Sequence, residues 1–184
     1  MVDIGKYIVE ELSRNHNRDT FSCGVEALDE YLKKDARRQN KENINQTKVL
    51  VEKSSKEKDI VGFFGLATTT ISPKSLPSGE RKKFPCSEVP CIKLTRFAIG
   101  KRHQKKGLGK YLLFCALKHA LKLSKDVGIY AVIIDAKNDS VKTFYLENGF
   151  YTLSDLIVYL PIREIEANLK SLNASRHQKK GSLK

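Results

Sequence analysis

The residues with the clearest chemical potential lie in one short segment in the middle of the chain. A strand-like stretch that ends at Ile99 is followed by a basic loop, residues 101–106, and then by a helix-like pattern. The first amides of a helix have no acceptor within it and lie at the positive end of its dipole, so they attract phosphate groups. Glycines let the backbone approach a ligand, and lysines neutralise its charge. The pattern predicts a pyrophosphate site of the kind that CoA would occupy. Its residues are Gln104, Lys105, Lys106, Gly107, Leu108, Gly109 and Lys110.

Two other phosphate-binding motifs do not fit this segment. A dinucleotide-binding fingerprint needs a third glycine where the chain has Leu112, and a P-loop needs serine or threonine where the chain has Tyr111. The hexapeptide RHQKKG of residues 102–107 recurs as residues 176–181, but the second copy follows no strand and opens no helical pattern. We therefore expect the ligand at the first copy only. A solvated basic turn is the alternative interpretation of the first copy.

The composition indicates one basic domain. The chain has 184 residues, and its 34 Lys and Arg exceed its 21 Asp and Glu, which gives a net charge of +13. Five of the basic residues lie in a tail without acids, residues 168–184, and without them the charge is still +8. Such an excess favours an anionic partner, and nucleic acid is the first to consider.

The cysteines and histidines do not indicate a metal site, because the four residues of each type fit no metal-binding spacing. A disulfide between Cys86 and Cys91 is the minor alternative to four reduced cysteines. No apolar run long enough to span a membrane is visible, and no signal peptide. We therefore expect a cytoplasmic protein.

Apolar periodicity predicts a mixed α/β sheet. The most regular helix is residues 25–39, where apolar residues recur every three or four positions. Residues 129–136 form a nearly continuous apolar run, typical of a strand buried on both faces. Residues 72–90 are predicted to be a long loop with room for a helical turn, and the chain beyond Arg163 an appended extension. The other predicted strands are residues 4–12, 46–53, 60–70, 91–99 and 150–160, and the other predicted helices are residues 108–123 and 140–147.

Two segments together resemble the GNAT acetyltransferases. Residues 104–109, Q-K-K-G-L-G, are similar to the family's Q/R-x-x-G-x-G/A motif. Asn138, Phe144-Tyr145 and Asn148-Gly149-Phe150 resemble its N-x-x-A-x-x-F-Y-x-x-x-G-F pattern, with Val141 in place of the usual small residue. The combination is far more specific than either half.

This resemblance implies a fold and a cofactor. The fold is the α/β (mixed α+β) GNAT fold, with a central mixed, mostly antiparallel sheet of about six or seven strands flanked by helices. A single domain would occupy residues 1–163, and residues 164–184 would be a basic extension, helical at first and then disordered. The cofactor is acetyl-CoA, with CoA as a product.

The resemblance also implies roles for residues outside the loop. The backbone of Phe97, Ala98 and Ile99 would pair with the pantetheine arm and face the carbonyl oxygen as charge develops on it. Tyr145 would give a proton to the CoA sulfur, and Asn138 would also contact the cofactor. GNAT-type catalysis is direct attack of a neutral amine on the thioester, so no covalent nucleophile is expected. The sequence shows no compelling general base, and core packing is the alternative role for Tyr145.

A narrower resemblance begins at Phe21. Residues 21–39, F-S-C-G-V-E-A-L-D-E-Y-L-K-K-D-A-R-R-Q, are similar to the first helix of the TacT-like acetyltransferase toxins of type II toxin-antitoxin systems. Residues 94–99 and 133–138 also resemble that group, whereas Gly100 departs from it. The resemblance implies acetylation of the α-amino group of aminoacyl-tRNA, which blocks translation, and a ribbon-helix-helix antitoxin as partner. An α-amine has a pKa near ~8 against ~10.4 for lysine, so more of it is neutral at pH 7.

Basic side chains could hold the phosphates of such an RNA, and contacts of this kind position a nucleic acid rather than read its sequence. The candidates are Lys33, Lys34, Arg37, Arg38, Arg81, Lys82, Lys83, Lys93 and Arg96. Each alone could equally be a solvated surface charge. Two other functions stay open: a GNAT that acetylates a protein, peptide or small-molecule amine, and a non-catalytic GNAT-shaped module that binds nucleic acid. A homodimer stays open as well.

Overall fold

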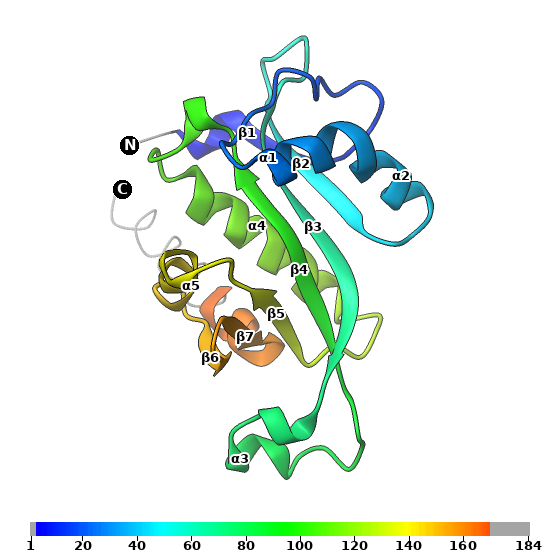
Figure 1. Cartoon of the computed structure of the whole chain (residues 1–184), viewed down its shortest axis with the longest axis vertical. Coiled ribbons are helices and arrows are strands. Elements are labelled where there is room, and N and C mark those ends of the chain that lie inside the picture. Colours follow the sequence, from blue (N-terminus) through cyan, green and yellow to red (C-terminus); the bar gives the residue numbers. More distant parts are fainter. Residues whose placement is uncertain (1–2, 170–184) are drawn as a thin grey trace, which may run out of the picture. The chain divides into compact units, whose positions relative to one another are not determined.

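Figure 1 shows the protein as a computed structural model, which describes residues 3–169. Within this range the chain divides into two compact units. Unit 1 comprises residues 3–68 and 93–116, and unit 2 comprises residues 69–92 and 117–169. Each unit therefore combines two separate stretches of the sequence.

The strands form one mixed, mostly antiparallel sheet in the order β1-β2-β3-β4-β5-β7-β6. Strand β2 pairs antiparallel with β1 and β3, and β7 pairs antiparallel with β5 and β6. Their bounds are β1 Tyr7–Glu11, β2 Gln46–Glu52, β3 Ile60–Ile71, β4 Val89–Ile99, β5 Ala131–Asp135, β6 Tyr151–Ser154 and β7 Ile157–Pro161. Seven strands flanked by helices confirm the predicted fold class.

One helical run follows the first strand in unit 1. It consists of α1 Glu26–Glu30, a π-helical turn Tyr31–Asp35 and α2 Ala36–Lys41. The predicted apolar stripe faces the core, since Leu32 and Ala36 have no exposed surface. They belong to a cluster with side chains of β2 and β3 that include Val49, Val51, Ile60 and Phe63. The apolar spacing did not reveal the π-helical turn, a rare element that is frequent at functional sites.

A buried polar network joins this turn to the sheet. The hydroxyls of Tyr31 and Thr47 lie 2.8 Å apart, and the Asn45 amide donates to the Tyr31 hydroxyl at 2.5 Å. Thr95 on β4 donates to the Asn45 side-chain oxygen at 2.9 Å. The Arg96 guanidinium carbon lies 5.1 Å from the centre of the Tyr31 ring. Because buried polar groups need partners, the network fixes the turn to one position on the sheet.

Unit 2 is held together by an apolar cluster and by one acidic residue. The cluster comprises Leu76, Val89, Cys91, Ala131, Ile133 and Tyr159. The acidic residue is Glu80 on α3 Ser78–Arg81, which accepts hydrogen bonds from Tyr130, from Lys83 at 2.7 Å and from Arg163 at 2.7 Å. The hydrogen bonds from Lys83, Tyr130 and Arg163, in that order, lower the pKa of Glu80 to about 2.

The remaining helices follow the predictions closely. Helix α4 Leu108–Leu123 begins after the basic loop, and α5 Asp139–Leu146 is capped by the side chain of Asn138, which accepts the Val141 N–H at 3.0 Å. Residues 162–169 are helical too, and Ile165 there is 2% exposed. The start of the predicted extension is therefore packed within unit 2. The rest of it, including the second RHQKKG copy, lies outside the described residues.

One prediction of secondary structure is wrong. The predicted strand 150–160 is a hairpin, in which β6 and β7 pair antiparallel around a turn at Asp155-Leu156. The turn has neither the glycine nor the proline that usually marks one, so the segment was taken as continuous. The predicted loop 72–90 contains a 3₁₀ turn, Pro73–Ser75, as well as α3, so the helical turn expected there is present. Among the described residues, no helix is long and apolar enough to cross a membrane.

Candidate functional site

The predicted pyrophosphate loop, residues 101–107, lies in unit 1 between the end of β4 and the start of α4. Its backbone has a positive φ at Lys105, 58°, and at Gly107, 82°. Glycine adopts this conformation without steric cost. A Cβ at Gly107 would meet nothing within 4 Å, so the backbone conformation, rather than lack of space, favours glycine here. The loop is open at this point and leaves room for a ligand.

The first turn of α4 supplies hydrogen-bond donors to the same loop. The N–H of Tyr111 donates to Gly107 O at 3.3 Å, so the three amides of residues 108–110 precede the first N–H that donates within the helix. Lys105 and Lys106 are exposed beside them. Burial, and after it the charge of Lys106, lowers the pKa of His103, which keeps that imidazole neutral at pH 7. Free amides, a helix dipole and two lysines fit the pyrophosphate of acetyl-CoA.

The Gln104 side chain closes the loop onto the rest of unit 1. Its amide nitrogen donates to Ile99 O, the last residue of β4, and to Cys23 O, both at 2.9 Å. These two bonds use both N–H groups of the amide. Gln104 therefore shapes the loop, and the backbone amides of residues 108–110 are left as the donors for a ligand.

The first-helix segment, residues 21–39, holds the other side of the loop. Besides Cys23 O, Ser22 O accepts the N–H of Lys101 at 2.8 Å. Gly24 has a φ of 93°, and a Cβ there would lie 2.6 Å from Lys101 Cε. The residues that resemble the toxin-type acetyltransferases thus contact the loop directly, although Cys23 and Gln104 are 81 positions apart in the sequence. No pattern in the sequence indicates this contact.

Asp29 of α1 fixes the two carbonyls that hold the loop. Its carboxylate accepts the N–H of Cys23 at 2.8 Å and the hydroxyl of Ser22 at 3.1 Å. Burial alone would raise the pKa of Asp29, but the hydrogen bonds from Cys23 and Ser22 outweigh it and lower that pKa. The carboxylate is therefore ionised at neutral pH and acts as a double acceptor. Asp29 was absent from the predicted site because its role depends on a turn far from the loop in sequence.

The end of β4 is packed closely against β3. Ala98 and Ile99 are buried, and Phe97 is half-buried. A Cβ at Gly62 of β3 would lie 2.6 Å from Ile99 Cδ1 and 2.8 Å from Ala98 O. Any side chain at position 62 would therefore push against the backbone that the family resemblance predicts to face the thioester.

Tyr145, the predicted acid, belongs to unit 2 and lies on α5. Its side chain is 4% exposed and meets the rings of Phe144 and Phe150 edge-on, with centroids 5.2 and 5.5 Å away. Burial raises the pKa of the Tyr145 phenol, so the hydroxyl holds its proton at neutral pH. Gly149, with a φ of 90°, ends the helix and lets Phe150 return to the cluster. Tyr145 is thus packed among aromatic rings, and its hydroxyl keeps the proton that it is predicted to donate.

The predicted RNA-binding residues fall into different environments. Several already serve the fold: Lys34 pairs with Glu30, Arg38 with Asp35 and Glu42, Lys83 with Glu80, and Arg81 donates to Lys74 O and Leu76 O. Arg96 donates to Thr95 O and covers the Tyr31 ring. By contrast, Arg37 is half-buried and has no carboxylate within ion-pair distance in residues 3–169. It is therefore available to an external anion.

The cysteines are all free, so the alternative of a disulfide between Cys86 and Cys91 is wrong. Burial raises the pKa of Cys23 and of Cys91 to about 11, which makes both thiols poor nucleophiles. Within residues 3–169, no three His, Cys, Asp or Glu side chains are placed to bind a metal ion.

The fold and the loop are those of an acyl-CoA-binding transferase, and a comparison with known families gives its class. Residues 9–150 match the Acetyltransferase (GNAT) family. The chain belongs to this family, and acetyl-CoA is its acetyl donor.

Within the family, the chain is similar to toxins. It is 29% identical over 131 residues to a protein of Mycobacterium tuberculosis (strain ATCC 25618 / H37Rv) named tRNA-acetylating toxin, which covers 71% of this chain and 76% of that protein. Among solved structures, a mutant of KacT has a TM-score of 0.84 at 29% identity, with 88% of this chain and 98% of that chain covered. AtaT complexed with acetyl-methionyl-tRNAfMet has a TM-score of 0.82 at 27% identity, with 89% and 99% covered.

Proposed function

We propose that this protein is a toxin that acetylates the α-amino group of an aminoacyl-tRNA and so blocks translation. The observation that carries the proposal is the similarity, over almost the whole described chain, to AtaT complexed with acetyl-methionyl-tRNAfMet. The net charge of +13 supports an anionic substrate. The first-helix segment supports it as well, because the residues that resemble the toxin group are those that hold the pyrophosphate loop through Ser22 and Cys23.

The residues of this chain position the cofactor and donate one proton. In this proposal the amides of residues 108–110, with Lys105 and Lys106, hold the pyrophosphate, and the bound cofactor brings an activated thioester. The backbone of residues 97–99 orients the acyl group. The protonated Tyr145 phenol gives its proton to the departing sulfur. No residue is needed as a strong base, because an α-amine with a pKa near ~8 is partly neutral at pH 7 and the proton that it loses on attack can pass to water.

The test is direct acetylation of charged tRNA. A pool of aminoacyl-tRNA is incubated with the protein and radiolabelled acetyl-CoA, and the RNA is then deacylated in mild alkali. We expect label in the RNA fraction and its release together with the amino acid. If label never enters the RNA while free amines or peptides are acetylated under the same conditions, the protein is a GNAT that acetylates a protein, peptide or small-molecule amine. If nothing is acetylated, the non-catalytic module is favoured.

Several further properties belong to this proposal. We place the protein in the cytoplasm, where charged tRNA is found, and treat residues 1–163 as one acetyltransferase domain. A ribbon-helix-helix antitoxin and a second copy of the chain are the proposed protein partners. Co-expression with the product of the neighbouring reading frame, followed by size-exclusion chromatography with light scattering, tests both.

A further inference from the structure

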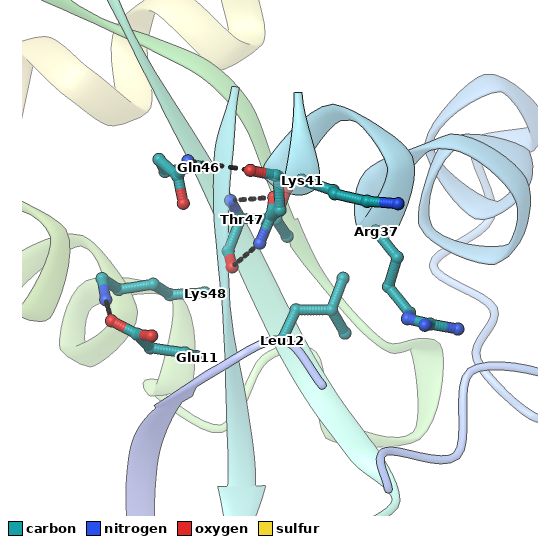
Figure 2. Close-up of a pocket in the computed structure, with 8 residues that line it drawn as sticks. Glu11, Leu12, Arg37, Lys41, Gln46, Thr47 and Lys48 are labelled. Carbon is teal, nitrogen blue, oxygen red and sulfur yellow. Dashed lines mark hydrogen bonds and ion pairs between the residues drawn. The ribbon is translucent and has the colours of Figure 1, made fainter. Parts of the chain in front are cut away.

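A polar pocket of about 320 Å³ lies in unit 1 between α2 and the paired strands β1 and β2. Figure 2 shows the side chains around it, which come from all three elements. The lining residues are Glu11, Leu12, Arg37, Asn40, Lys41, Gln46, Thr47 and Lys48. Leu12 is the one apolar residue among them. The pocket is thus suited to a polar or charged ligand.

The uncharged polar side chains that line the pocket already have hydrogen-bond partners within the protein. The Asn40 side chain accepts the Thr47 N–H at 2.8 Å and donates to Thr47 O at 3.1 Å, which ties α2 to β2. The Gln46 amide donates to Asn40 O at 3.2 Å and to the Asn43 side chain at 3.1 Å. These groups therefore hold the shape of the pocket and do not compete for a ligand.

Two of the charged side chains that line the pocket have no ion-pair partner in residues 3–169. Lys48 pairs with Glu11 at 3.0 Å, which leaves the charges of Arg37 and Lys41 uncompensated. These two are four residues apart on α2, so they share one face of the helix. In residues 3–169 neither has a carboxylate within ion-pair distance, whereas the adjacent Arg38 is paired with Asp35 at 2.7 Å. The same helix thus neutralises its cations on one side and leaves them available at the pocket.

We propose that this pocket binds a phosphodiester group of the tRNA substrate, with Arg37 and Lys41 as the phosphate ligands. The proposal rests on the proposed function, and neither Lys41 nor Lys48 was among the predicted RNA contacts. A guanidinium forms paired hydrogen bonds to phosphate oxygens, and a half-buried one keeps more of its attraction than a solvated one. A docked peptide would need apolar anchors, which this lining does not offer beyond Leu12. A contact of this kind positions the RNA and reads no base.

The test compares neighbouring arginines. Binding of uncharged tRNA to wild type, Arg37→Gln, Lys41→Gln and Arg38→Gln is measured by fluorescence anisotropy over a range of salt concentrations. Each lost phosphate contact should reduce the slope of log K against log salt by about 1. Between about 50 and 200 mM salt, wild type should then lose about fourfold more affinity than Arg37→Gln or Lys41→Gln. Arg38→Gln should change the slope less, because its charge is already paired.

Three results would contradict the proposal that this pocket binds a phosphodiester group. Equal slopes for Arg37→Gln and wild type would do so, as would an equal effect of Arg38→Gln. The third is a loss that affects inorganic phosphate or a polyglutamate peptide, titrated separately, but not tRNA. Acetyl-CoA affinity, measured in parallel, should be the same in all variants, which also shows that they are folded. If wild type acetylates charged tRNA but Arg37→Gln and Lys41→Gln have the wild-type slope, the proposed phosphate site is wrong and the proposed function is retained. If wild type does not acetylate charged tRNA at all, the function itself fails.

Discussion

Replacing Asp29 with alanine should weaken acetyl-CoA binding although Asp29 lies outside the loop. The carboxylate fixes Ser22 and Cys23, whose carbonyl oxygens accept the Lys101 N–H and the Gln104 amide. Without the carboxylate, the two carbonyls are no longer held in place. The loop must then be ordered when the cofactor binds, so part of the binding free energy is lost.

The size of the effect follows from the bonds involved. Removing the acceptor from the buried Cys23 N–H should destabilise the fold by about 1–3 kcal/mol. The two hydrogen bonds that Ser22 and Cys23 accept from the loop contribute about 0.5–1.5 kcal/mol each. If both must be rebuilt on binding, the binding free energy weakens by about 1–3 kcal/mol, which is roughly 5- to 150-fold in affinity.

The assay is calorimetric titration with acetyl-CoA, together with urea unfolding to confirm that each variant is folded. Asp29→Asn is the rescue variant, because its side-chain oxygen can still accept the Cys23 N–H. Glu30→Gln is the matched control, since the Glu30 carboxylate is paired with Lys34. Turnover at saturating acetyl-CoA should stay near the wild-type rate in Asp29→Ala, with the change confined to KM for the cofactor.

A folded Asp29→Ala protein with wild-type acetyl-CoA affinity would refute this reasoning. So would full additivity with Gln104→Ala, because two residues that hold one loop should show a coupling energy of about 0.5 kcal/mol or more. A loss of turnover without a change in KM would mean that Asp29 acts on another step.

The other predictions concern the cofactor, the acid and the pH dependence of stability. Gly107→Asp should abolish detectable acetyl-CoA binding in calorimetry, because it adds strain at a φ of 82° and a negative charge, whereas Gly128→Asp at another open position should not. Tyr145→Phe should keep acetyl-CoA affinity but lower kcat by roughly 10²-fold in a stopped-time assay, and a wild-type kcat would leave that residue a packing role. Glu80→Gln should lower stability by about 1–2 kcal/mol at pH 7 in urea unfolding. Because the folded pKa of Glu80 is depressed to about 2, its contribution is present above its ordinary pKa and is lost as pH falls from about 4.5 towards 2, so the two unfolding curves should converge there. Curves that stay equally separated down to pH 2 would contradict this.

Local patterns were sufficient for most of the fold. The helix of residues 25–39 and the run of residues 129–136 were predicted correctly because apolar spacing decides which face a short segment buries. The hairpin of β6 and β7 was missed because its turn has no glycine or proline. The π-helical turn was missed because one added residue changes the period too little to be seen in so short a run.

The site was predictable where it depends on the backbone and unpredictable where it depends on distant partners. The amides of residues 108–110, which precede the first hydrogen bond of α4, follow from the order of strand, loop and helix alone. The double hydrogen bond of Gln104 does not, since Cys23 is 81 positions away. The charges of Arg37 and Arg38 are identical in the sequence, and their different pairing appears only once the helix is built.

The helical run of residues 26–41 links the two sites, and its middle is the part that neither site uses directly. Asp29 at one end holds the predicted pyrophosphate loop, and Arg37 at the other end lines the pocket proposed for a phosphodiester group. The π-helical turn between them is fixed by Tyr31 through Asn45 and Thr47. A change at either end should therefore alter one kind of binding alone. Tyr31→Leu removes both the hydroxyl and the ring in the middle, and should weaken acetyl-CoA affinity and the salt dependence of tRNA binding together. If only one of the two changes, the ends of the run are positioned independently and the helix is not the common support.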